Sequence, residues 1–218
     1  MDTICRLRNT IIKTGIELLD KGLITGTWGN ISACCSQSQL VAITPSGRDY
    51  RTLCPEDIVI VDYAGKTRLG CRIPSSELPL HLAIYKARPD IKAVVHTHSI
   101  FASACSVARK PILPIIEDLI QVNGGTVEIA DYALPGTEQL AQNAITALGA
   151  KSAVLLANHG VIGCGQTLGE ASLVCELVEK AAQIYIYANQ LGGASVLSNS
   201  DVTAMHGFYQ QHYRKRKE

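Results

Sequence analysis

Short β-rich runs alternate with segments of helical periodicity along the chain, and this alternation constrains the fold more than any other feature. The runs GTWGNISACC, QLVAITPSG and DIVIVDYAGK are broken by glycine, serine and proline, a pattern typical of neighbouring antiparallel strands joined by turns. Helices are expected over residues 2–22, 76–87, 99–108, 136–148 and 167–193, and further strands over 93–99, 125–133 and 152–160. This irregular alternation predicts an α/β layered fold in which helices flank a central mixed, largely antiparallel β-sheet.

Length and composition narrow the class of protein. A chain of 218 residues, 47% of them apolar, can bury one substantial core, so we expect a single domain over 1–218 with a solvated C-terminal tail over 194–218. The net charge of +1 gives no field for nucleic acid or an anionic membrane, and no apolar run reaches the roughly 20 residues that cross a bilayer. Eight cysteines without a C-x-x-C pair, behind an N-terminus without a signal-type run, indicate a cytoplasmic protein.

Two histidines two positions apart close the strand expected at 93–99. Alternate residues of a strand point to the same side, so His96 and His98 project together, as two ligands of one metal ion would. His159 ends a second apolar run, and Gly160 after it frees the backbone to turn sharply, which makes His159 a natural third ligand. Three neutral imidazoles suit zinc or a similar divalent ion when a carboxylate completes the set.

Glu77 is the candidate carboxylate, because it lies in the first turn of the helix expected at 76–87. A favourable charge at a helix N-terminus is its alternative role. Ser75 and Ser76 precede it, and a helix N-terminus with two hydroxyl groups can hold a phosphate beside the metal, with ordinary capping as the alternative.

Two glycine-containing loops have the same anion-binding character. Gly29 and Asn30 belong to the first loop, and Ser46 and Gly47 to the second; each offers backbone amides and a small polar side chain. Taken singly, both loops are also ordinary turns. Trp28, just before the first loop, is expected to pack beneath it as a core residue.

The motifs TWGNIS, ITPSGRDY, PSSE, AVVHTHS and LLANHG, in this order, resemble the class II aldolase/adducin family from about residue 5 to residue 190. The resemblance implies a metal site for Zn²⁺, with Mn²⁺ or Co²⁺ as other divalent ions, at Glu77, His96, His98 and His159. It implies a site for the phosphate of a sugar phosphate at Gly29, Asn30, Ser46, Gly47, Ser75 and Ser76. It also implies that Glu77 is the catalytic acid/base and that the protein is a homotetramer with active sites between subunits.

The implied activity is cleavage of a ketose 1-phosphate, such as L-fuculose 1-phosphate, to dihydroxyacetone phosphate and an aldehyde through an enediolate. Where related aldolases carry a catalytic tyrosine from a neighbouring subunit, this chain has PIIEDLIQ, so Glu117 and Asp118, in a predicted loop, are candidates to replace it. A solvated acidic pair is their alternative role. Tyr213 is matched to a second catalytic tyrosine in the tail.

Other activities stay open at this point. Epimerases that act on L-ribulose 5-phosphate, and dehydratases or decarboxylases of sugar phosphates, share the metal and phosphate parts in this family. The epimerases usually carry aspartate at the position of Glu77, so the SSE motif favours an aldolase. A non-catalytic, adducin-like interaction module is the alternative of a different class, and the intact ligand set favours an enzyme.

Overall fold

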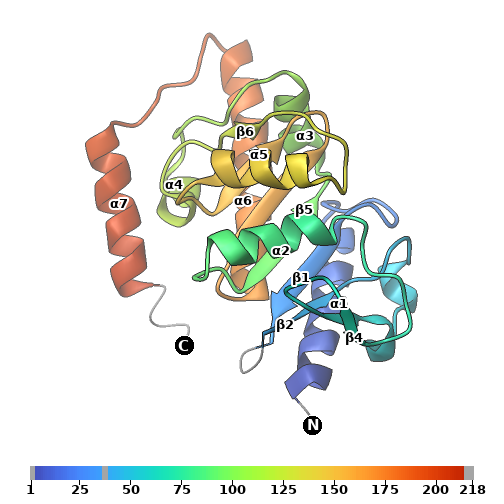
Figure 1. The fold of residues 1–218 in the computed structure, drawn as a ribbon. Coiled ribbons are helices and arrows are strands. Elements are labelled where there is room, and N and C mark those ends of the chain that lie inside the picture. Colours follow the sequence, from blue (N-terminus) through green and yellow to red (C-terminus); the bar gives the residue numbers. More distant parts are fainter. Residues whose placement is uncertain (1–2, 36–38, 214–218) are drawn as a thin grey trace.

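The computed structural model describes residues 3–35 and 39–213 and confirms the layered α/β architecture with a mixed sheet (Figure 1). Its strands are β1 Asn30–Cys34, β2 Leu40–Ile43, β3 Val59–Asp62, β4 Thr67–Leu69, β5 Ala93–Thr97, β6 Ile129–Ala130, β7 Ala153–Leu156 and β8 Gly160–Gly165. Its α-helices are α1 Thr3–Asp20, α2 Leu78–Ala87, α3 Ile100–Val107, α4 Glu117–Asn123, α5 Glu138–Leu148, α6 Leu168–Gln190 and α7 Asn199–His212.

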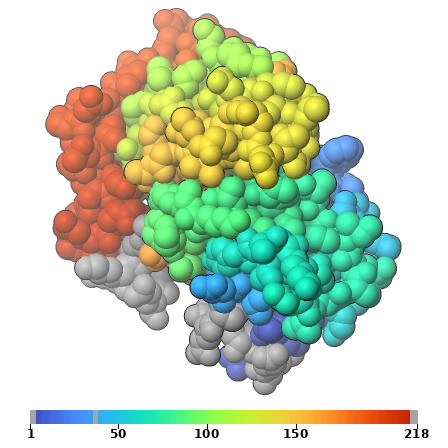
Figure 2. Space-filling model, viewed as in Figure 1, coloured from blue at the N-terminus to red at the C-terminus, as the bar shows by residue number. Residues whose placement is uncertain are grey.

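The sheet runs in the order β4-β3-β2-β1-β5-β8-β7-β6, and every neighbouring pair is antiparallel except β6 and β7. Alternate side chains of each strand enter cores on opposite faces. On one face, α2 and α5 cover β5 residues such as Val94; on the other, α1 and α6 cover Ala93 and Val95. Figure 2 shows α2 and α5, green and yellow, side by side on the viewer's face, with α7 forming a ridge along one side.

Strand β8 is an interior strand of the sheet, between β5 and β7, yet the sequence pattern did not predict it. Half of its six residues are glycine, which has low strand propensity. The structure gives a reason for Gly163, because a Cβ there would lie 2.6 Å from both Ala171 O and Cys175 Sγ of α6. Close approach of α6, rather than propensity, therefore explains this glycine.

Three other expectations need correction. The strand expected at 125–133 is reduced to the two residues of β6, supplemented by a single bridge between Ile112 and Val127. Glu117 and Asp118 lie in the first turn of α4 and not in a loop. The described part of the expected tail contains α7, whose His206 Nδ1 donates to Gln121 O of α4 at 2.8 Å.

The remaining tail residues, 214–218, lie outside the described part of the chain. Among the helices that are described, none combines the length and apolar character needed to span a membrane.

The strand order brings the predicted motifs to one end of the sheet. Because β1 and β8 both run antiparallel to β5, the start of β1 and the turn between β7 and β8 lie beside the end of β5. Asn30 pairs with His96 in the register of β1 and β5. A bridge between Pro45 and Pro74 then joins the loop after β2 to the segment before α2. The four motif-bearing segments therefore meet at the carboxyl end of β5.

Candidate active site

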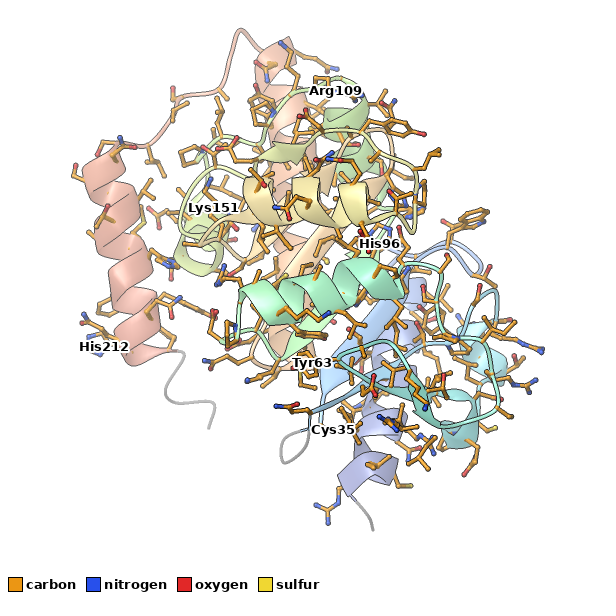
Figure 3. The ribbon with its side chains drawn as sticks, in the orientation of Figure 1. Cys35, Tyr63, His96, Arg109, Lys151 and His212 are labelled. Carbon is orange, nitrogen blue, oxygen red and sulfur yellow. The ribbon has the colours of Figure 1, made fainter. Side chains whose placement is uncertain are left out.

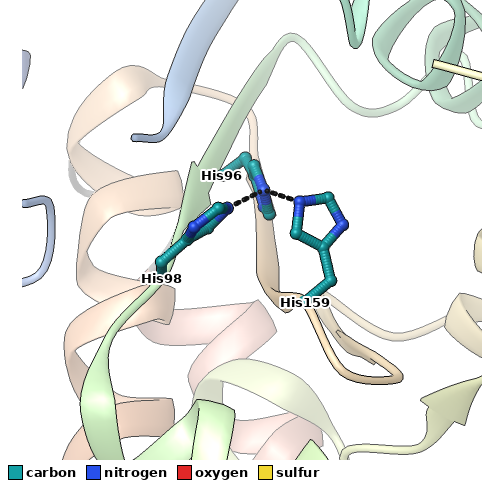
Figure 4. A group of neighbouring side chains, drawn as sticks. All are labelled: His96, His98 and His159. Carbon is teal, nitrogen blue, oxygen red and sulfur yellow. Dashed lines mark hydrogen bonds between the residues drawn. The ribbon is translucent and has the colours of Figure 1, made fainter. Parts of the chain in front are cut away.

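Three imidazoles converge at the end of β5 (Figure 4). His96 lies in β5, His98 follows one residue after the strand ends, and His159 lies in the turn between β7 and β8. The Nε2 atom of His96 is 2.8 Å from that of His98 and 3.3 Å from that of His159. Each residue offers one ligand atom, and these atoms all lie within 4.8 Å of one another. The cluster could therefore hold a metal ion.

The orientation of His96 fits a metal ligand. Its Nδ1 is 3.0 Å from Val161 O and donates to it, because a carbonyl only accepts, and this bond turns Nε2 toward the cluster. Two ligand atoms of a tetrahedral zinc ion, each about 2.0–2.1 Å from the metal, lie about 3.3 Å apart. The distance between the Nε2 atoms of His96 and His159, 3.3 Å, matches this separation, whereas the Nε2 atoms of His96 and His98 lie closer together, at 2.8 Å.

Glu77 completes the ligand set. It is the residue immediately before α2, its side chain is buried, and α2 begins beside the labelled His96 in Figure 3. Its Oε2 lies 3.1 Å from His96 Nε2, and its Oε1 lies 3.4 Å from His159 Nε2. Oε1 is buried without a hydrogen-bond partner among the described residues. A buried carboxylate oxygen costs free energy when it is unpaired, and a bound cation would remove that cost.

The protonation states also suit a cation. Burial lowers the pKa of His98 to about 3 and that of His159 to about 4, and the neighbouring imidazoles add to both shifts. Burial raises the pKa of Glu77, but electrostatic attraction to His96 and His159 and the amide of Asn30 outweigh it and bring the pKa to about 2. Near neutral pH, Glu77 is therefore ionised while His98 and His159 offer lone pairs.

A cavity of about 350 Å³ opens beside this cluster. All six residues predicted to bind phosphate line it, together with Glu77, His98 and His159: they are Gly29, Asn30, Ser46, Gly47, Ser75 and Ser76. Gly29 is required by its φ of +129° and by proximity, because a Cβ there would lie 2.8 Å from His96 O. The loops and the histidines thus form one connected site.

Trp28 does not pack beneath its loop as expected. Its side chain is 67% exposed and lines the cavity, with its ring centroid 6.2 Å from that of His98. A large aromatic ring at the cavity mouth offers an apolar contact to whatever enters.

The other three predicted catalytic residues do not line this cavity. Asp118 of α4 pairs with Lys180 of α6 at 2.5 Å, and Glu117 precedes it in the same turn. Tyr213 follows α7, where its ring stacks on that of Tyr209. Figure 3 shows that the end of α7, at the labelled His212, lies far from His96.

Several residues that support the site escaped sequence reasoning. Thr27, Pro45 and Pro135 also line the cavity. Thr27 and Pro45 belong to the motifs TWGNIS and ITPSGRDY but were not themselves predicted as site residues, and Pro135 lies in none of the predicted motifs. The carboxylate of Glu179 in α6 accepts from the backbone amides of Phe101 and Ala102, at 2.9 and 2.8 Å, and so fixes the start of α3 just after His98. That contact spans more than 70 residues of sequence and had no local signal.

Comparison with known proteins agrees with this geometry. The model of the Class II Aldolase and Adducin N-terminal domain matches residues 9–186. The 5-deoxy-D-ribulose 1-phosphate aldolase of Bacillus thuringiensis serovar kurstaki is 40% identical over 195 residues, which cover 89% of this chain and 91% of that protein. The L-fuculose phosphate aldolase of Escherichia coli O6:H1 is 39% identical over 182 residues, 83% of each chain.

A solved structure of an L-fuculose 1-phosphate aldolase has a TM-score of 0.91 at 38% identity and covers 94% of this chain and 96% of that one. These matches confirm the resemblance of the sequence motifs. This chain belongs to the class II aldolase and adducin family.

Proposed function

We propose that this chain is a zinc-dependent aldolase that cleaves a ketose 1-phosphate to dihydroxyacetone phosphate and an aldehyde. One observation carries the proposal: three imidazole Nε2 atoms and an orphaned carboxylate oxygen converge beside a cavity lined by three small polar loops. An interaction module would have no need for this arrangement, since bringing four such groups together, with His96 and Glu77 buried, is costly without a ligand.

The metal, when bound, would supply Lewis-acid stabilisation of the negative charge that develops on the substrate when the C3–C4 bond breaks. The loops bind the other end of the substrate. Ser46, Ser75 and Ser76 offer hydroxyl groups at the cavity wall, and Gly29 and Gly47 let the backbone approach a phosphate closely. Contacts remote from the breaking bond orient C3 toward Glu77.

Glu77 is proposed as the acid/base. In the direction of condensation, its ionised carboxylate takes a proton from C3 of dihydroxyacetone phosphate; in cleavage, the same proton returns to C3. Burial among the histidines keeps Glu77 within reach of both the ligand cluster and the cavity. Glu77 would help the three histidines to hold the metal, and the same carboxylate lines the cavity in which the proton at C3 is moved.

We also propose a homotetramer with active sites between subunits, in which Glu117, Asp118 or Tyr213 acts in a neighbour's site. Five large apolar side chains are exposed at positions that line the cavity or lie within three residues, in sequence, of a lining residue or a candidate metal ligand. They are Trp28, Ile73, Ile100, Tyr132 and Leu134. Large exposed apolar side chains are enriched at interfaces when they lie together on a surface. Light scattering should give a mass about four times 23.4 kDa, and Ile100→Asp should lower it; a monomeric wild type would refute this part.

The sugar is expected to carry an apolar end. Relatives are named for 5-deoxy-D-ribulose 1-phosphate and L-fuculose phosphate, whose aldehyde fragments end in a methyl group. The exposed ring of Trp28 at the cavity mouth would suit such a fragment. We therefore propose a deoxy-ketose 1-phosphate as the substrate class.

The test is release of dihydroxyacetone phosphate, followed by a coupled dehydrogenase, from zinc-loaded protein and a panel of ketose 1-phosphates. We expect release from a deoxy sugar, abolished by a chelator and restored by zinc. Metal content is measured in parallel. Stoichiometric zinc with no release from any sugar would refute aldolase activity and direct attention to epimerase, dehydratase or decarboxylase chemistry, and a folded protein that binds no metal would favour an interaction module.

A further inference from the structure

A buried ladder of polar side chains leads from the active site into the core between β1 and α2. Asn30 and Ser32 alternate along β1, while Glu77, His81 and Tyr85 are spaced four residues apart at the start of α2 and along it. All five are at least nine-tenths buried. The two rows interlock through four hydrogen bonds, in the order Glu77, Asn30, His81, Ser32, Tyr85.

The chemistry of the groups fixes the direction of every bond. The ionised carboxylate of Glu77 only accepts, so Asn30 donates to Glu77 Oε2 from Nδ2, at 2.9 Å. Asn30 Oδ1 must then accept from His81 Nε2, at 2.5 Å, which makes His81 the neutral Nε2–H tautomer.

His81 Nδ1 is consequently a bare acceptor, to which the Ser32 hydroxyl donates at 2.6 Å. Ser32 Oγ in turn accepts from the Tyr85 hydroxyl at 2.6 Å. The neutral state of His81 is supported by burial, which lowers its pKa to about 3.

On the basis of the proposed aldolase function, we propose that His81 is a positioning residue, held as its Nε2–H tautomer by Ser32 and Tyr85, that locks the amide of Asn30 with its N–H bonds toward Glu77 and the cavity. One N–H holds Glu77 Oε2, and the second has no acceptor among the described residues and is left for the substrate. An amide turned the other way would place Oδ1 against the carboxylate, where it repels the charge instead of stabilising it. The ladder thus controls the orientation of the catalytic carboxylate from a distance of two hydrogen bonds.

A purely structural role would be met more simply by apolar side chains. Burying four neutral polar groups is costly unless each is paired, and here each has its partner along one defined path that ends on the carboxylate. Tyr63 provides a matched comparison, since its ring centroid is 6.5 Å from that of Tyr85 but its hydroxyl contacts Cys34 Sγ and lies outside the ladder.

The test uses zinc-loaded protein and the variants Ser32→Ala and Tyr85→Phe, with Tyr63→Phe as the control. We expect Ser32→Ala to lower kcat about tenfold, because the amide of Asn30 is no longer held toward Glu77. The KM should change less than about threefold, because the five predicted phosphate-binding residues other than Asn30 are unaffected. Tyr85→Phe should have a smaller effect in the same direction, and Tyr63→Phe should leave both constants unchanged. ¹⁵N NMR of labelled imidazoles should show His81 as pure Nε2–H in the wild type and as a mixture of tautomers in Ser32→Ala.

A change of unfolding midpoint in Ser32→Ala, with the wild-type tautomer and kcat retained, would overturn the proposal, and so would a wild-type His81 protonated at Nδ1. If the wild type releases no dihydroxyacetone phosphate, the proposed function fails independently. The proposed role of His81 is then tested by two other measurements on Ser32→Ala, the tautomer of His81 and the affinity for zinc. The affinity should fall severalfold, because the ligand Glu77 is less well held. A tautomer and a zinc affinity both equal to those of the wild type would overturn the proposal.

Discussion

Replacing Gly160 by alanine is expected to disrupt the metal site with little direct effect on the phosphate loops. Gly160 follows His159 and begins β8, opposite the end of β5. A Cβ at this position would lie 2.3 Å from Thr97 O, 3.0 Å from His98 Cδ2 and 3.2 Å from His96 Cε1. The added methyl group would therefore press against the backbone between two ligands and against both of their rings.

The size of the effect follows from these distances. Carbon and oxygen approach to about 3.3 Å at the closest, so β5 and β8 must separate by about 1 Å near Thr97. Metal–ligand distances tolerate about ±0.2 Å, which is several times less than that separation. Changes behind metal ligands weaken affinity about 10- to 100-fold, and we expect Gly160→Ala to fall in this range. Overpacking should also lower the free energy of unfolding by about 1–3 kcal/mol.

The assay is competition for zinc with a chromophoric chelator, with urea unfolding of the metal-free protein measured alongside. Gly163→Ala is the matched control, since it lies in the same strand and its Cβ would meet Ala171 O and Cys175 Sγ at 2.6 Å, on the side of α6. It should lose similar stability but keep its zinc affinity. Gly207→Ala in α7 meets nothing within 4 Å and should stabilise the protein by up to about 1 kcal/mol. Wild-type zinc affinity in Gly160→Ala would refute the reasoning.

Three further outcomes are expected. Glu77→Gln should keep the fold and most of the metal while turnover falls about 100-fold or more, as measured by dihydroxyacetone phosphate release; unchanged turnover would remove Glu77 from the chemistry. The buried His81 has a pKa of about 3 in the folded protein against about 6.5 in the unfolded chain, so the unfolded chain binds more protons between these values. The contribution of neutral His81 to the free energy of unfolding is complete above pH 6.5 and falls by up to about 1.4 kcal/mol per pH unit on acidification. Urea titrations of the chelated protein at several pH values should detect this slope, and His81→Gln should reduce it. Glu117→Gln should lower kcat about tenfold, whereas Asp118→Asn should leave kcat unchanged. The reason is that Asp118 is paired with Lys180, while Glu117 has no ion-pair partner in the described part of the chain. Equal kcat in the wild type and Glu117→Gln would exclude Glu117 as the replacement for the family's tyrosine.

Local spacing made much of this protein predictable from its sequence. The i, i+2 pattern of His96 and His98 was enough to place both imidazoles together, since a strand repeats every two residues. Helical periodicity similarly located α1, α2, α5 and α6 to within a few residues. The ordered motifs then identified the family, because they carry both the turn chemistry of the loops and the ligand types.

Tertiary structure decided the features that depend on contacts between distant segments. Strand β8 is rich in glycine because α6 packs against it closely, and a propensity pattern contains no record of that approach. Trp28 is exposed and lines the cavity, whereas its apolar character alone favoured the core. The ladder from Glu77 to Tyr85 forms only because antiparallel strands place the start of β1 beneath α2. Sequence alone thus determined which groups this protein carries and on which local faces, and long-range packing determined which of them meet and how each is oriented.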